Sequence, residues 1–310
     1  MAVTLTRHTI HSVLDYHLHL WPHGQRDRSP TLEEVASYCE EAAKAGVAEI
    51  ALTEHLFRFA EADHLLRGFW EDEPDAALRA SMADYWDEHA HASLDHYVET
   101  VLEAKAAGLP VVLGLEVDYY RGRMDQVAVL LAGYPFDVLL GSVHWIGTWR
   151  FDDLRDPASM GEWSKREVEA AWDDYTSAME ELAASEACDV LAHPDLIKVT
   201  GKRPMHPEEC WDRLTEAART SGMAAELSSA GWRKPVGEAY PDRGLLERFV
   251  AAGVALTTAS DSHGLGDVAS RSTELRSLLE EMGVDTLQAY RARRAVAVPV
   301  DRTLTIGDEG

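Results

Sequence analysis

The stretch DYHLH at residues 15–19 places two histidines two positions apart at the end of a short apolar run. Side chains alternate between the two faces of a strand, so His17 and His19 share one face if this run is a strand. Six further apolar runs also end in small polar clusters: TEH 53–55, EVD 116–118, SVH 142–144, HPD 193–195, SSA 228–230 and DSH 261–263. Polar clusters at the ends of seven strands predict a barrel whose rim carries a polynuclear metal site.

Helices are expected between these strands. Thr31 and Glu34 have the spacing of a capping box that starts a helix, and Ser164 and Glu167 are predicted to start another that runs toward Ala187. Four helices are predicted to end at a glycine, which accepts the left-handed cap conformation: Gly46, Gly108, Gly222 and Gly253. The strands are near-continuous apolar runs, which favours parallel strands covered on both faces. The sequence therefore predicts an α/β protein with a TIM-barrel-like (β/α)7 barrel.

Residues 1–310 are interpreted as one domain, because no repeat or low-complexity linker divides them. Residues from about 58 to 95 interrupt the alternation and are rich in acids, aromatics and histidine, so we expect a lid-like insertion over the site. His89 and His91 within it repeat the spacing of the first motif. Their surroundings predict a helix, on which residues two apart point in different directions, so they are not predicted ligands.

The composition limits the kinds of molecule that the protein is expected to bind. The chain has a formal net charge of -25, which argues against a nucleic-acid polymer or an anionic membrane surface. It does not argue against a small phosphorylated substrate, because metal ions can supply positive charge locally. No apolar run is long enough to span a bilayer. Three cysteines fit no disulfide framework, and the first residues lack a signal-peptide pattern, so we expect a cytoplasmic protein.

The polar clusters contain ligands suited to zinc, iron or manganese. The nine candidate ligands are His17, His19, His23, His55, Glu116, His144, His193, Asp261 and His263. Nine exceed the need of one zinc ion and suffice for two or three divalent ions if Glu116 bridges. Clustered ions of this kind orient a phosphate, generate hydroxide near neutral pH and neutralise charge on a transferred phosphoryl group.

In this order, the motifs resemble those of the PHP (polymerase and histidinol phosphatase) superfamily, and most of all its histidinol-phosphatase branch. The motifs are DYHLHLWPHG, LTEH, GLEVDY, GSVHW, AHPDLIK, ELSSAGWRKPVGEAYP and ASDSH. The resemblance spans about Asp15 to His263 and implies a distorted (β/α)7 barrel with a trinuclear site. It assigns one ion to His17, His19, Glu116 and Asp261, a second to Glu116, His144 and His193, and a third to His23, His55 and His263.

Two adjacent cations follow the sixth predicted strand, at the rim where a barrel binds its ligand. Arg233 is predicted to bind phosphate bidentately, with Lys234 beside it; the alternative for Arg233 is a surface salt bridge with Glu238 or a neighbouring acid. Lys198 is a weaker candidate and could equally be a solvated loop lysine. Glu116, Asp261 and Arg233 are the predicted catalytic residues. Acids next to the ligands could orient imidazoles or protonate the leaving oxygen: Asp15, Glu54, Asp118 and Asp195.

The function that these residues favour is metal-dependent hydrolysis of a phosphomonoester, and the resemblance implies histidinol phosphate as substrate. The same metal chemistry would also serve another phosphomonoester, a nucleotide or a cyclic phosphodiester. A non-catalytic binding module is a third possibility. A metal-dependent amidohydrolase is a fourth, although the sequence offers no candidate for the bridging lysine of such enzymes. The sequence leaves the oligomeric state open.

Overall fold

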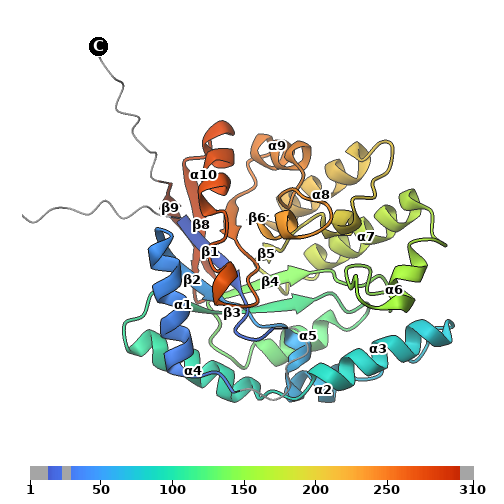
Figure 1. Ribbon diagram of the computed structural model, residues 1–310, viewed down its shortest axis with the longest axis horizontal. Helices are drawn as coiled ribbons and strands as arrows, with labels where there is room; N and C mark the ends of the chain where they lie inside the picture. Colours follow the sequence, from blue (N-terminus) through green and yellow to red (C-terminus); the bar gives the residue numbers. More distant parts are fainter. Residues whose placement is uncertain (1–12, 23–28, 301–310) are drawn as a thin grey trace, which may run out of the picture.

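The computed structural model describes residues 13–22 and 29–300. Seven parallel strands follow one another in sequence order around a barrel (Figure 1). They are β1 (Val13–Leu18), β2 (Val47–Leu52), β3 (Val111–Asp118), β4 (Val138–Ser142), β5 (Val190–Leu191), β6 (Ala224–Ser228) and β7 (Leu256–Ala259). The ring closes between the first and last strands, where the His19 amide donates to the Ser262 carbonyl at 2.8 Å. The predicted (β/α)7 barrel is confirmed.

Helices surround this barrel. They are α1 (Leu32–Lys44), α2 (Ala60–Leu66), α3 (Ala76–His89), α4 (Leu94–Ala106), α5 (Met124–Leu131), α6 (Pro157–Glu162), α7 (Val168–Ala184), α8 (Glu208–Ser221), α9 (Arg243–Ala251) and α10 (Ser272–Glu281). Every residue of β3 is buried, as expected for a strand between the barrel interior and a helical layer. None of the helices in the described residues is long and apolar enough to cross a membrane.

The helix ends test the predicted caps. Thr31 and Glu34 form the predicted capping box at α1, and Gly222 ends α8 in the left-handed conformation with φ 74°. The second predicted capping box is wrong. Helix α7 starts at Val168, and Glu167 caps it without a side-chain hydrogen bond. Ser164 instead donates to the Gly161 carbonyl at 2.7 Å, because it directly follows the short helix α6 and its hydroxyl satisfies a carbonyl there.

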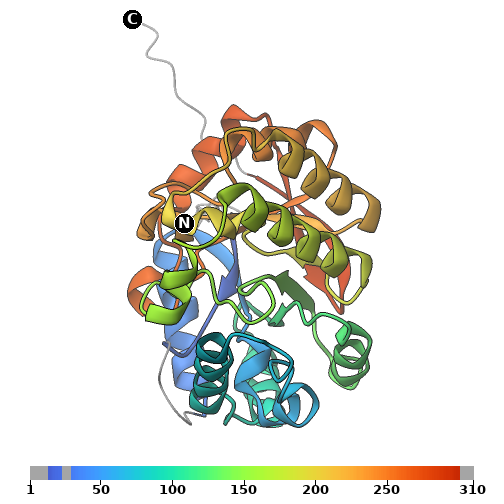
Figure 2. The ribbon, with the colours of Figure 1, turned by 90° about the vertical axis from the view of Figure 1, so that its right-hand side faces the viewer.

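The segment from 58 to 95 folds mainly as α2 and α3, with the 3-10 turn Leu56–Arg58 before them. Figure 2 shows these helices together on one side of the barrel. Side chains tie α3 to the loop after β4, since Ser81 donates to Asp156 at 2.7 Å. The helix expected around the second histidine pair is confirmed for His89 and wrong for His91. Helix α3 ends at His89, and His91 lies in the turn that follows.

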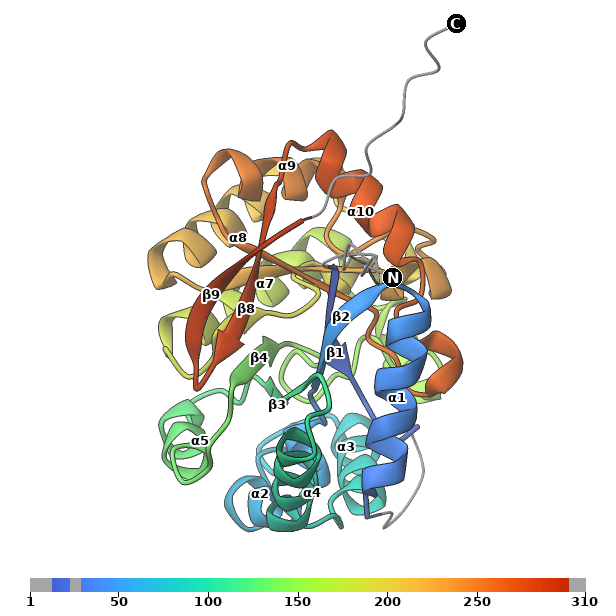
Figure 3. The ribbon, with the colours of Figure 1, turned by 90° about the vertical axis from the view of Figure 1, so that its left-hand side faces the viewer.

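An antiparallel hairpin, β8 (Thr286–Arg291) and β9 (Arg294–Pro299), was not predicted from the sequence. It contacts β1 and β7 and is drawn in dark red in Figure 3. Arg293 on its turn pairs with Asp189, the residue before β5, at 3.0 Å. The hairpin therefore packs at the amino ends of the strands, and the carboxyl ends remain available for a functional site.

Candidate metal centre

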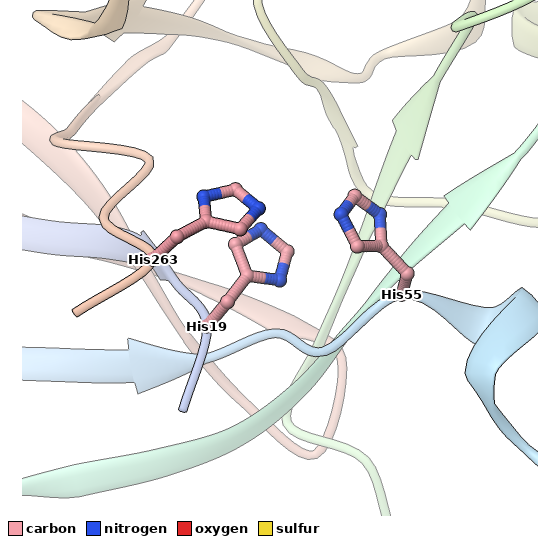
Figure 4. Close-up of side chains that lie close together, drawn as sticks. All are labelled: His19, His55 and His263. Carbon is pink, nitrogen blue, oxygen red and sulfur yellow. The ribbon is translucent and has the colours of Figure 1, made fainter. Parts of the chain in front are cut away.

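Eight of the nine predicted ligands gather at the carboxyl ends of the strands; His23 lies outside the described residues. His17 belongs to β1 and Glu116 to β3, while the others lie at or just beyond strand ends. Asp261 and His263 follow β7, which neighbours β1, so residues from opposite ends of the sequence meet. Figure 4 shows one such group, in which His19, His55 and His263 converge. Parallel strands closed into a barrel account for this convergence.

Five imidazole rings surround the buried carboxylate of Glu116. Oxygen Oε2 lies 3.1 Å from His17 Nε2, 3.4 Å from His19 Nε2 and 2.7 Å from His55 Nδ1. Oxygen Oε1 lies 3.4 Å from His144 Nε2 and 3.1 Å from His193 Nε2. Each oxygen thus faces its own set of rings, which is the arrangement of a carboxylate able to bridge two cations.

These residues fit divalent metal ions. Nε2 of His17 and Nε2 of His19 are buried and form no hydrogen bond with any residue of the described chain. Such atoms are costly to leave without a partner. Four groups have ligand atoms within 4.8 Å of one another: His19–His55–His263, His17–Glu116–His193, His17–His19–Asp261 and His55–Glu116–His144.

Carboxylates behind the rings orient them. Asp118 Oδ1 lies 2.5 Å from His144 Nδ1, and Glu226 Oε2 lies 2.8 Å from His17 Nδ1. A carboxylate on Nδ1 fixes the tautomer and turns Nε2 toward a metal. The sequence analysis named Asp118 and missed Glu226. The available signal was that Glu226 is the single charged residue in the buried run of β6.

The other acids named beside ligands accept hydrogen bonds from the backbone. Asp15 accepts from the Ser260 amide and hydroxyl, both at 2.7 Å. Glu54 accepts from the amide of Leu20 at 2.6 Å, and its Oε2 also lies 3.6 Å from His19 Nδ1, behind a predicted ligand. Asp195 accepts from the Asp242 amide at 2.7 Å. All three acids are buried, and none lines the cavity described below.

Burial and neighbouring charge set the protonation of the centre. Burial disfavours charge on Glu116, but the rings of His17 and His55 outweigh it and hold the pKa of Glu116 well below its usual value. Burial lowers the pKa of His55 well below the usual value. At His17 and His144 the neighbouring carboxylates outweigh burial, raising the pKa of His17 well above its usual value and that of His144 to about 10. An ionised bridge and neutral imidazoles are the forms that bind a metal, so metal binding would release protons from these two rings. Asp261 adopts a left-handed backbone conformation with φ 51°, which is uncommon for residues other than glycine.

A cavity of about 580 Å³ opens onto the centre. His55, His144, His193, Asp261 and His263 line its metal-facing side. Helix α3 contributes Tyr85, Glu88 and His89, and the loop after β4 contributes Trp145, Arg150 and residues 152–157. The sequence analysis expected residues 58–95 to lie over the site but named no individual wall residue, because their approach to the centre depends on how α3 packs against that loop.

The three predicted substrate-binding cations have different surroundings in the structure. Lys234 lines the cavity. Lys198 is fully buried and pairs with Asp195 at 2.8 Å and Glu238 at 2.7 Å, so it supports the loop beneath the site. Arg233 donates through Nη2 to the carbonyls of Ser260 at 2.7 Å and Asp261 at 2.9 Å. Arg233 thus holds the segment that carries Asp261, beside the cavity lining.

Known proteins share this architecture. A probable histidinol-phosphatase from Deinococcus radiodurans is 29% identical over 280 residues, covering 90% of this chain and 97% of the relative. A probable histidinol-phosphatase from Schizosaccharomyces pombe is 26% identical over 213 residues, covering 63% of this chain and 68% of the relative. The crystal structure of histidinol phosphate phosphatase from Lactococcus lactis, complexed with zinc, L-histidinol and phosphate, superposes with a TM-score of 0.65 at 19% identity, covering 92% and 99% of the two chains. The PHP domain model matches residues 16–230, and the chain belongs to this family.

Proposed function

We propose that this protein is a metal-dependent phosphomonoester hydrolase, and specifically a histidinol-phosphate phosphatase. The observation that carries the proposal is the buried Glu116 carboxylate surrounded by five imidazoles, three of which, His55, His144 and His193, line the adjoining cavity. The two relatives named probable histidinol-phosphatase support this substrate. We include in the proposal a single domain, residues 58–95 as a cover for the site, and a cytoplasmic location.

The centre would hold two or three divalent ions, drawn from zinc, manganese and iron, through the nine predicted ligands. When bound, such ions neutralise charge on the phosphoryl group and make water nucleophilic near neutral pH. The chain's own contribution is to fix the ligands. Glu116 would bridge, Asp118 and Glu226 would orient His144 and His17, and Arg233 would hold Asp261 in place.

Of the three predicted substrate-binding cations, Lys234 is the best placed to meet the phosphate, since it lines the cavity and Arg233 and Lys198 do not. An ammonium there attracts the transferred phosphoryl group, and this attraction grows as that group becomes more negative. Arg233 would add its charge from the side of Asp261. The role of these residues is to bind and orient the ester, so no covalent attachment to the protein is required.

Steady-state kinetics of the zinc- or manganese-loaded protein would test the proposal, with L-histidinol phosphate compared with several other phosphomonoesters. We expect the highest kcat/KM for L-histidinol phosphate. A higher kcat/KM for a nucleotide or a sugar phosphate would support the proposed metal chemistry and show that the proposed substrate is wrong. A protein that contains two or more ions and hydrolyses no phosphomonoester would refute the proposed activity.

A further inference from the structure

The cavity is lined by acids as well as by metal-binding residues. Its carboxylates are Glu88, Asp152, Asp153, Asp156 and Asp261. Three of the five have partners in the protein: Asp153 pairs with Arg150, Asp156 caps α6 and accepts from Ser81, and Asp261 belongs to the ligand set. Glu88 is exposed. Asp152 is thus the partly buried cavity acid whose role the protein itself does not explain.

Asp152 lines the same cavity as the metal-binding residues. It lies in the loop after β4 between Arg150 and Phe151 on one side and Asp153 on the other, and both Arg150 and Phe151 are buried. Among residues 13–22 and 29–300, no side chain forms a hydrogen bond or close ion pair with its carboxylate. It shares the cavity lining with His144, His193 and Lys234, so it lies beside the metal-facing wall.

Burial raises the pKa of the Asp152 carboxyl, with His144 and Lys234 acting in the opposite direction. A partly buried carboxylate without a hydrogen-bond partner is costly, and a cationic ligand would remove that cost. Lys234 does not fill this role, since no ion pair joins it to Asp152 within the described residues. The cavity therefore presents a free negative group close to the place where the phosphate would bind.

We propose that Asp152 determines specificity by binding the ammonium group of an amino-alcohol phosphate, while the ligand set and Lys234 bind its phosphate. This inference rests on the proposed function and names the substrate feature that the site recognises. In an amino-alcohol phosphate, the amino group lies two carbons from the ester oxygen. A carboxylate next to the phosphate site is therefore within reach of the ammonium group, and an ion pair shielded from water by the cavity walls is stronger than an exposed pair.

A matched pair of substrates isolates this contact. 2-Aminoethyl phosphate and n-propyl phosphate have chains of equal length and differ in ending with an ammonium or a methyl group. We expect the wild type to prefer the amino ester, measured as the ratio of the two kcat/KM values. Asp152→Asn keeps the size of the side chain and removes its charge, and it should lower this ratio by about 10- to 100-fold, the range for losing a hydrogen bond to a charged group. Glu88→Gln, which alters an exposed acid of the same cavity, should keep the wild-type ratio.

Calorimetric binding of L-histidinol to the metal-loaded protein provides a second measurement that needs no turnover. Asp152→Asn should weaken it by a similar factor without changing metal content. An unchanged ratio together with unchanged histidinol binding would overturn the role of Asp152, as would equal losses on both esters. If the wild type favours amino esters but hydrolyses L-histidinol phosphate poorly, the proposed substrate is wrong and the role of Asp152 stands. If the wild type is inactive but its binding of histidinol depends on Asp152, the proposed activity is wrong and the role of Asp152 again stands.

Discussion

Glu116 is the residue on which the centre depends, because both of its oxygens face imidazole nitrogens. Glu116→Gln keeps the shape of the side chain and removes its charge. A neutral amide bridges two cations poorly, so we expect metal content to fall and activity to fall by more than the roughly 10–100-fold typical of losing a supporting partner. Elemental analysis and kinetics would measure both, with Glu247→Gln on the surface of α9 as a control. A variant with full metal content and activity would contradict the bridging role.

Glu226 and Asp118 act through the rings that they orient. Glu226 also accepts from the backbone amide of His193 at 3.3 Å, so it supports two ligands. We expect Glu226→Gln and Asp118→Asn each to lower metal affinity or kcat/KM by about 10–100-fold. Metal titration would show the loss as weaker binding. Equal affinity in wild type and both variants would mean that the rings keep their orientation without these carboxylates.

At the scale of elements, the two HxH pairs differ in their surroundings. His17 and His19 extend from a strand, whereas His89 Nδ1 lies 2.7 Å from the Tyr85 carbonyl and His91 Nε2 lies 2.7 Å from the Asp87 carbonyl. We expect His17→Ala to lower metal content and His91→Ala to leave it unchanged. Elemental analysis of the two purified variants would compare them directly. Metal loss from His91→Ala would place this histidine in the centre after all.

Arg150 connects α3 to the loop after β4. It pairs with Asp153 and Asp156, donates to Ser81 at 2.7 Å and stacks over the Tyr85 ring at 4.3 Å. Arg150→Ala should lower the free energy of unfolding by about 1–3 kcal/mol, because it leaves partly buried acids without a cation. The loop that carries Asp152 should loosen too, so KM should rise. Denaturant unfolding and kinetics would measure both effects, and Arg150→Lys should recover only part of each.

The elements also show what a sequence can and cannot reveal here. The ligands were predictable because strand ends are local patterns, and parallel topology brings the ends of strands together whatever the loops do. Glu226 was missed because a single acid in an apolar run has no local partner in the sequence. Asp152 and Tyr85 were missed because α3 and the loop after β4 meet only through tertiary contacts such as Ser81–Asp156. The prediction that Ser164 caps α7 was wrong because its hydroxyl donates to the Gly161 carbonyl of α6 instead.

At the scale of the molecule, the centre joins the first strand to the last. His17 and His19 come from β1, and Asp261 and His263 follow β7, which closes the barrel next to β1. Ions bound to both segments would add to the hydrogen bonds that already join them, such as those from Ser260 to Asp15 and from the His19 amide to the Ser262 carbonyl. The site would therefore contribute to the stability of the barrel as well as to its chemistry.

Removing the metals should lower stability for this reason. A ligand that binds only the folded state stabilises it by about 4 kcal/mol at a free concentration roughly 1,000 times its dissociation constant. We expect chelation to lower the Tm by several degrees and abolish activity, and added zinc or manganese to restore both. Acidic pH should act in the same direction as chelation, because imidazoles must be neutral to bind metal and protonation releases the ions. Thermal unfolding of the loaded and chelated protein between neutral and acidic pH would test this. A chelated protein whose Tm equals that of the loaded protein at neutral pH would show that the barrel closes without help from the centre.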